Sequence, residues 1–153
     1  MAILIGTVVT WMAVTFFSII PKKIPPFETI FLFCVNTIFE LSIFSILHLN
    51  LKFIVVEPGI GNGIADLMLR LIELPLLLVA SSNILLYSNK VKWCWVALII
   101  LFTLLVQQTL EWMDIITFQR WNIMYTGIYM CVNVAFSSMM TWVITSLDKK
   151  ETA

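Results

Sequence analysis

Five long apolar runs occupy almost the whole chain and constrain its fold more than any other feature. A helix that crosses a bilayer needs about 20 mostly apolar residues, and each run reaches or approaches that length. The chain has 153 residues, of which 61% are hydrophobic and 12% charged, and its mean hydropathy is +1.01. A soluble domain of this length cannot bury so much apolar surface. The predicted spans cover residues 3–20, 27–49, 64–87, 92–112 and 122–147.

Only short connections separate the runs, so we predict one all-α domain over residues 1–153, a polytopic transmembrane helical bundle of about five spans. No long linker, internal repeat or low-complexity tail interrupts it. The first run lacks a basic n-region and a small-residue cleavage site, and it leads directly into Pro21-Lys-Lys-Ile-Pro-Pro26. These features favour a retained span over a cleaved signal peptide.

The basic residues predict an outside N-terminus and a cytoplasmic C-terminus in the cell membrane. Five spans place the first, third and C-terminal connections on one side, and Lys and Arg are enriched in cytoplasmic connections. That side carries Lys22, Lys23, Lys90, Lys92, Lys149 and Lys150, whereas only Lys52, Arg70 and Arg120 fall on or toward the other. Tryptophans close to the predicted span ends are expected to be interfacial anchors: Trp93, Trp95, Trp112 and Trp121.

The three cysteines and the charge balance exclude some functions. Cys34, Cys94 and Cys131 are isolated inside apolar runs, and we expect them to be buried thiols that pack as small hydrophobes. Nine basic residues balance nine acidic ones, so the chain has no excess of positive charge that would bind nucleic acid. We therefore expect no nucleic-acid partner and no cofactor.

A glycine-rich segment follows the second run and could be mistaken for a nucleotide site. Gly59, Gly61 and Gly63 form G-x-G-x-G, but the third glycine of a dinucleotide fingerprint would fall on Ile64. No second strand is available for a βαβ unit. We interpret the segment as a flexible outer loop in which Pro58 and the glycines end one element before the third helix.

The chain has one histidine, His48, near the outer end of the second span. Metal sites use three or four ligands at characteristic spacing, and Glu40, His48 and Asp66 reproduce no helical ligand pattern. We predict no metal site and expect an interfacial histidine that is hydrogen-bonded to a neighbour.

Three charges in the third span share one helix face. Asp66, Arg70 and Glu73 stand at i, i+4 and i+7. A charge at the centre of a bilayer costs about 2.5–3.5 kcal/mol on insertion scales, so these side chains are expected to turn inward and pair. We expect Arg70 to reach both Asp66 and Glu73. Pro75 follows and frees the carbonyl of Leu71, which predicts a kink or a local acceptor.

Polar side chains also follow one face of three other spans. We expect them to meet in a polar, hydrated chamber in the outer half of the bundle. Two bases, Arg70 and Arg120, are the available positive partners there for a larger number of acids: Glu40, Asp66, Glu73, Glu111 and Asp114. Such an excess suits a cation, a proton or a basic residue of a partner. Alternatively, the same groups are structural contacts worth about 0.6 kcal/mol each, which fix the helix register. The stripes are Asn36, Glu40 and His48; Gln107, Glu111 and Asp114 with Gln108 and Gln119; and Asn122, Thr126, Tyr129, Asn133 and Ser137.

A set of short motifs is spread over most of the chain. They are Pro21-Lys-Lys after the first span, Asp66 and Glu73-Leu-Pro75 in the third, the later Asn83, and Glu111 followed ten residues on by Trp121-Asn122. With these motifs the chain resembles a family of small uncharacterised five-span membrane proteins from spore-forming Gram-positive bacteria. The resemblance implies this architecture and a bacterial plasma-membrane location, and it implies no catalytic or binding residue.

Three functions are compatible with the sequence. The first is an accessory or scaffold component of a membrane assembly, which contacts the lipid bilayer and docks a membrane-protein partner or a second copy of itself. The second is binding or transport of an ion, proton or small ligand around Glu73 and Glu111. The third is an intramembrane enzyme with Glu40, Glu73 or Glu111 as acid or base, for which no catalytic constellation is apparent.

Overall fold

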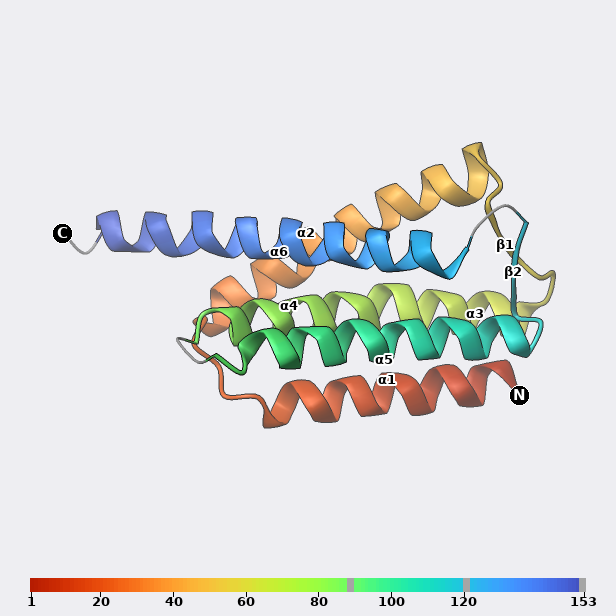
Figure 1. Ribbon diagram of the computed structural model, residues 1–153, viewed down its shortest axis with the longest axis horizontal. Helices are drawn as coiled ribbons and strands as arrows, with labels where there is room; N and C mark the ends of the chain where they lie inside the picture. Colours follow the sequence, from red (N-terminus) through yellow and green to blue (C-terminus); the bar gives the residue numbers. More distant parts are fainter. Residues whose placement is uncertain (88–89, 120–121, 152–153) are drawn as a thin grey trace.

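The chain folds into a bundle of long helices with a small sheet at one end (Figure 1). The computed structural model describes residues 1–87, 90–119 and 122–151. The helices are α1 (Ala2–Ile19), α2 (Pro26–Ser45) with the π-helical turn η1 (Ile46–Asn50), α3 (Ile60–Met68), the π-helical turn η2 (Leu69–Glu73), α4 (Leu74–Leu85), α5 (Lys92–Trp112) and α6 (Ile123–Glu151). The strands are β1 (Ile54–Val56) and β2 (Ile116–Phe118). Because α3, η2 and α4 follow one another without a break, the bundle has five continuous helices.

Each predicted span corresponds to one of these helices, and the bounds differ most in two places. The predicted third span, 64–87, begins too late, because Gly61 and Gly63 are already helical and the helix starts at Ile60. The helix α6 continues to Glu151, beyond the predicted end of the fifth span at 147. The all-α prediction is confirmed at this level.

Four helices are long and apolar enough to cross a membrane: Ala2–Ile19, Pro26–Asn50, Lys92–Trp112 and Ile123–Ser146. Large apolar side chains such as Trp11, Ile38, Leu101 and Trp142 are exposed on the outside of the bundle. Water would not tolerate so many exposed apolar side chains over four helices, whereas lipid would. The chain is therefore a helical membrane protein.

The helix formed by α3, η2 and α4 lies at the centre of the bundle. It contacts α1, α2, α5 and α6, and α4 lies among the other helices in Figure 1. Ten of the twelve residues of α4 are buried. The helix that carries the three charges is thus the one that faces lipid least.

Small side chains let α1 approach this central helix closely. The buried face of α1 consists of Ala2, Gly6, Thr10 and Ala13. A Cβ atom added at Gly6 would lie 3.2 Å from the Cα atom of Ala65 in α3. Helices in membranes use such small residues to bring their backbones into van der Waals contact.

The two ends of the bundle differ in character. The strand end holds the N-terminus and the sheet, in which β1 pairs antiparallel with β2 and Ile54 lies opposite Phe118 (Figure 1). The expectation of a flexible loop is wrong for residues 54–56, because the β-branched sequence Ile-Val-Val finds a partner strand. The basic end holds the connection 20–25, residues 86–87 and 90–91, and the end of α6, and the lysines Lys22, Lys23, Lys90 and Lys92 lie there.

The cysteines occupy the outside of the bundle. Cys34, Cys94 and Cys131 are free thiols and all three are exposed, so the expectation that they are buried is wrong. Each falls on a helix face that is turned away from the centre, where a small apolar thiol is compatible with lipid.

Candidate functional site

A buried cluster of ionic side chains joins α2, α3, η2 and α6. Arg70 Nε donates to Asp66 Oδ1 at 2.9 Å and to Oδ2 at 3.1 Å. Arg70 Nη1 donates to Glu40 Oε1 at 3.3 Å, and the Tyr129 hydroxyl donates to Glu40 Oε2. Arg70 and Asp66 are each 5% exposed and Glu40 is fully enclosed. We call these four residues the Arg70 cluster.

Arg70 is also covered by an aromatic ring. Its guanidinium carbon lies 3.4 Å from the centroid of the Phe44 ring, and Phe44 in turn stacks on His48 with centroids 5.3 Å apart. His48 Nδ1 lies 2.8 Å from the carbonyl oxygen of Ile54, within hydrogen-bonding distance. His48 therefore stacks on the ring that covers Arg70, and it links that ring to the start of β1. Stacking of guanidinium on an aromatic face is favourable where both are desolvated.

The predicted partners of Arg70 are corrected in one respect. Arg70 pairs with Asp66 as expected but with Glu40 in place of Glu73. Long side chains in a helix point back toward its N-terminus, which carries the guanidinium toward Asp66 and away from Glu73. The π-helical turn η2 also departs from the ordinary i, i+3 geometry that the expected contact requires.

The irregularity predicted around Pro75 is this π-helical turn. The backbone N–H of Leu74 donates to the carbonyl of Leu69, five residues earlier, and Pro75 follows with no N–H of its own. Placing the wider turn here sets Arg70 and Glu73 on the buried side of the helix, since both are 5% exposed or less. The turn thus positions the charged side chains inside the bundle.

Glu73 is the least satisfied of the buried acids. It is 1% exposed, its Oε1 atom has no hydrogen-bond partner, and it forms no salt bridge within the described part of the chain. It lines a cavity of about 20 Å³ together with Asp66, Thr103 and Gln107. A cavity of that size holds about one water molecule. The hydrated chamber expected from the sequence is therefore a small void at this position.

The polar stripe at the end of α5 only partly joins this site. Gln107 lines the cavity, but Glu111 accepts a hydrogen bond from Gln108 Nε2 at 2.9 Å on the surface of α5. Asp114 is exposed, with a positive φ of 52° in the turn after the helix. The expectation that Glu111 and Asp114 enter one chamber with Glu73 is wrong: the rotation of α5 turns Glu111 away from the cavity, and Asp114 follows the end of the helix at Trp112. Arg120 lies outside the described residues.

A second polar network lies nearer the basic end. Asn36 Nδ2 donates to Ser137 Oγ at 2.8 Å, and the hydroxyls of Ser137 and Ser82 are also 2.8 Å apart. These contacts tie α2, α4 and α6 together. Asn133 lies between the two networks on α6, and its Nδ2 donates to the Tyr129 carbonyl at 3.1 Å.

The sequence places Tyr129 and Ser137 on the face of α6 that carries these contacts, and it includes Glu40 among the five acids available to Arg70 without singling it out. Ser82 was missed. The signal for Ser82 is the polar triplet Ser81-Ser82-Asn83 inside an apolar run. No signal in one sequence selects Glu40 as the partner of Arg70, because the two residues are 30 positions apart and on different helices.

The arrangement can hold helices together and can hold a small cation or a proton. The carboxyl groups of Glu40 and Asp66 bond to the guanidinium of Arg70, and the carboxyl group of Glu73 lines the small cavity beside it. Within residues 1–87, 90–119 and 122–146, no three His, Cys, Asp or Glu side chains gather as a metal site would require. Neither a family model, nor a curated protein, nor a solved structure matches this chain. The class that the fold defines is a helical membrane protein with a buried ionic cluster.

Proposed function

We propose that this protein is an accessory or scaffold component of an assembly in the cell membrane, and that its partner is another membrane protein. The observation that carries the proposal is the length of α6. Its 29 residues extend about 43 Å at 1.5 Å per residue, against a hydrocarbon core of about 30 Å. In Figure 1 its C-terminal part projects beyond the other helices at the basic end. A helical end that projects beyond the other helices that the structure describes offers a contact surface for a second protein.

The Arg70 cluster supports the same proposal. Its guanidinium is already bonded to two carboxylates and covered by Phe44. The charges of the cluster therefore serve to stabilise the packing of the helices. A permeation path needs continuous polar space, whereas the cavity beside Glu73 is about 20 Å³. Both features suit a protein that acts through its outer surface.

Five spans with the N-terminus outside are part of this proposal. α2 ends at the strand end and α5 begins at the basic end (Figure 1), so the chain between them must run the length of the bundle. The helix from Ile60 to Leu85 does so, with 26 residues or about 39 Å. The enrichment of lysines at the basic end supports a cytoplasmic location for that end. The resemblance to the small five-span bacterial family supports a bacterial plasma membrane as the location.

Native mass spectrometry of the protein, extracted gently from its own membrane, tests the accessory role. We expect a heteromeric complex of fixed stoichiometry, which is lost when the chain is ended after Ser146 and kept in the Glu111→Gln variant. Glu111 is the control because its carboxylate bonds only to Gln108 on the same helix. A bare monomer or a homo-oligomer in every preparation would contradict the accessory role.

A second candidate function is binding of one monovalent cation or proton at Glu73. The specific observation is the buried Oε1 atom that lacks a hydrogen bond and faces a cavity with Thr103 and Gln107 in its wall. Intramembrane carboxylates of this kind commonly mark ion or proton sites. Cation flux into liposomes that is lost in Glu73→Gln and retained in Glu111→Gln would support it. Equal flux in liposomes with and without the protein would contradict it.

A further inference from the structure

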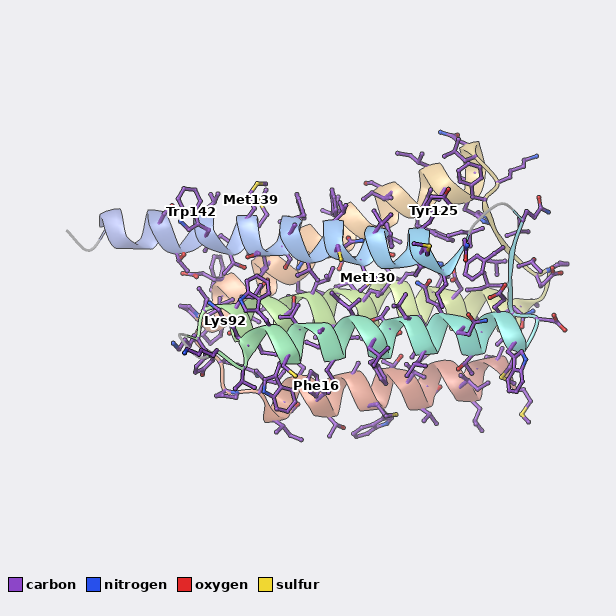
Figure 2. The ribbon with its side chains drawn as sticks, viewed as in Figure 1. Phe16, Lys92, Tyr125, Met130, Met139 and Trp142 are labelled. Carbon is purple, nitrogen blue, oxygen red and sulfur yellow. The ribbon has the colours of Figure 1, made fainter. Side chains whose placement is uncertain are left out.

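An apolar cavity opens at the basic end of the bundle, away from the Arg70 cluster. Its volume is about 320 Å³, and it lies where the end of α1, the end of α4 and the start of α5 meet. Phe16 and Lys92, labelled in Figure 2, belong to its lining. The walls are mainly the side chains of Phe16, Ile20, Ile84 and Trp95, and the polar groups of the lining come from Tyr87 and Lys92.

The position of the cavity places it across the boundary between hydrocarbon and headgroups. Phe16 lies one turn inside the end of α1, whereas Lys92 is the first residue of α5. Trp95 is half exposed beside it, as tryptophans at the interface commonly are. An apolar hollow at this depth favours an alkyl chain over water.

The lysines at this end are held in place by the protein. Lys92 Nζ donates to the Leu85 carbonyl at 3.4 Å, and Lys23 Nζ donates to the Leu86 carbonyl at 3.2 Å. Lys23 Nζ also lies 4.1 Å from the centroid of the Tyr87 ring. Each ammonium has three N–H donors, so both retain donors for another acceptor after these bonds form.

The charge around the cavity is positive without compensation from the segments that line it. Residues 1–27 and 74–110 contain Lys22, Lys23, Lys90 and Lys92 but no Asp or Glu. The cavity is lined by residues of these two segments. A ligand that complements it therefore has an apolar chain and an anionic head.

We propose that this cavity binds an anionic phospholipid, with an acyl chain between Phe16, Ile84 and Trp95 and the phosphate at Lys92 and Lys23. A free phosphate would satisfy the lysines but leave the apolar walls empty. A zwitterionic lipid would fill the walls but bring a cationic group to the lysines. An anionic phospholipid satisfies both parts of the site, and cytoplasmic leaflets are rich in such lipids.

Native mass spectrometry of the purified full chain, mixed with dioleoylphosphatidylglycerol or dioleoylphosphatidylcholine, tests the proposal. We expect one phosphatidylglycerol to be retained at least about tenfold more tightly than phosphatidylcholine, and retention to weaken as salt is raised. Lys92→Gln should weaken retention of phosphatidylglycerol about fivefold, since one lysine at a membrane surface contributes about 1 kcal/mol. Lys52→Gln, at the strand end, is the matched control and should leave it unchanged.

A second variant tests the apolar walls of the cavity. It is needed because Lys92→Gln also removes the bond of Lys92 to the Leu85 carbonyl. Ile20→Trp fills the cavity and should abolish retention of both lipids while the helical circular dichroism stays unchanged. Equal retention of the two lipids by the natural chain would overturn the proposal. So would unchanged retention in both Lys92→Gln and Ile20→Trp, or displacement of the lipid by millimolar inorganic phosphate alone, which would show that the lysines bind phosphate without the chain.

Discussion

Replacing Arg70 by Gln should strongly destabilise the bundle, and the structure indicates by how much. Among the residues that the structure describes, Arg70 is the only cation that pairs with Glu40 and Asp66, and both carboxylates are buried. Removing one partner of a buried ion pair costs about 3–5 kcal/mol, because the remaining charge is left unpaired in a medium of low polarity. The shorter amide of Gln could replace at most some of the hydrogen bonds that the guanidinium makes to Asp66 and Glu40. We expect a loss of about 3–5 kcal/mol in the free energy of unfolding.

Glu40→Gln should cost less than Arg70→Gln. Arg70 would keep both of its bonds to Asp66, and the amide oxygen of Gln could still accept from Tyr129. The expected loss is about 1.5–3 kcal/mol, the contribution of one hydrogen bond to a charged group. In the double variant the stranded Glu40 charge is gone, so its loss should be smaller than the sum of the two single losses by about 1–3 kcal/mol.

Reversible unfolding in mixed detergent micelles measures these free energies, with the fluorescence of the six tryptophans as the signal. Glu111→Gln is the control and should change the free energy of unfolding by no more than about 0.5 kcal/mol. Additive losses in the double variant, or a loss below about 1 kcal/mol for Arg70→Gln, would refute the conclusion that Arg70 holds Glu40 and Asp66 together in the membrane.

Three further predictions follow from the packing and the proposed topology. Gly6→Val should lower the free energy of unfolding by about 1–3 kcal/mol, because it forces α1 away from the backbone of α3. The control is Gly127→Ala, whose added Cβ meets nothing within 4 Å. It should be neutral or stabilising by up to about 1 kcal/mol in the same unfolding assay. Ser137→Ala removes hydroxyl contacts to α2 and α4 and should cost about 0.6–1.7 kcal/mol; a change near zero would mean that water replaces the hydroxyl. In a cysteine-free chain on intact cells, a membrane-impermeant maleimide should label Lys52→Cys and spare Lys22→Cys, and the reverse pattern would invert the proposed orientation.

The helices were predictable from the sequence because lipid imposes a length and a polarity on each of them. The bounds of α5 agree with the prediction at both ends, since Lys92 and Trp112 mark the ends of its apolar run. The start of the central helix was predicted four residues too late, at 64 instead of 60, because glycines are poor helix formers in isolation. Packing of α3 against α1 outweighs that preference here.

The candidate site was predictable along a helix but not between helices. Asp66 and Arg70 are four positions apart, so helical periodicity alone brings them together. The pairing of Arg70 with Glu40 depends on how α2 leans against η2, and helix packing angles leave several rotations open. The same limit explains the error at Glu111: its position on α5 shares a face with Gln107, but the rotation of α5 brings only Gln107 to the cavity.

The central helix shows why polarity along a membrane chain has to be interpreted together with burial. By length and composition the described chain has four spanning candidates, and the helix from Ile60 to Leu85 is not among them. It is interrupted by η2 and carries three charges, so its sequence resembles a span less than the others do. Because it contacts α1, α2, α5 and α6, those helices shield its polar atoms, and only its few exposed side chains need to be apolar. The helix that lipid touches least can therefore hold the most charge, and for that reason Arg70 and its partners occur on this helix.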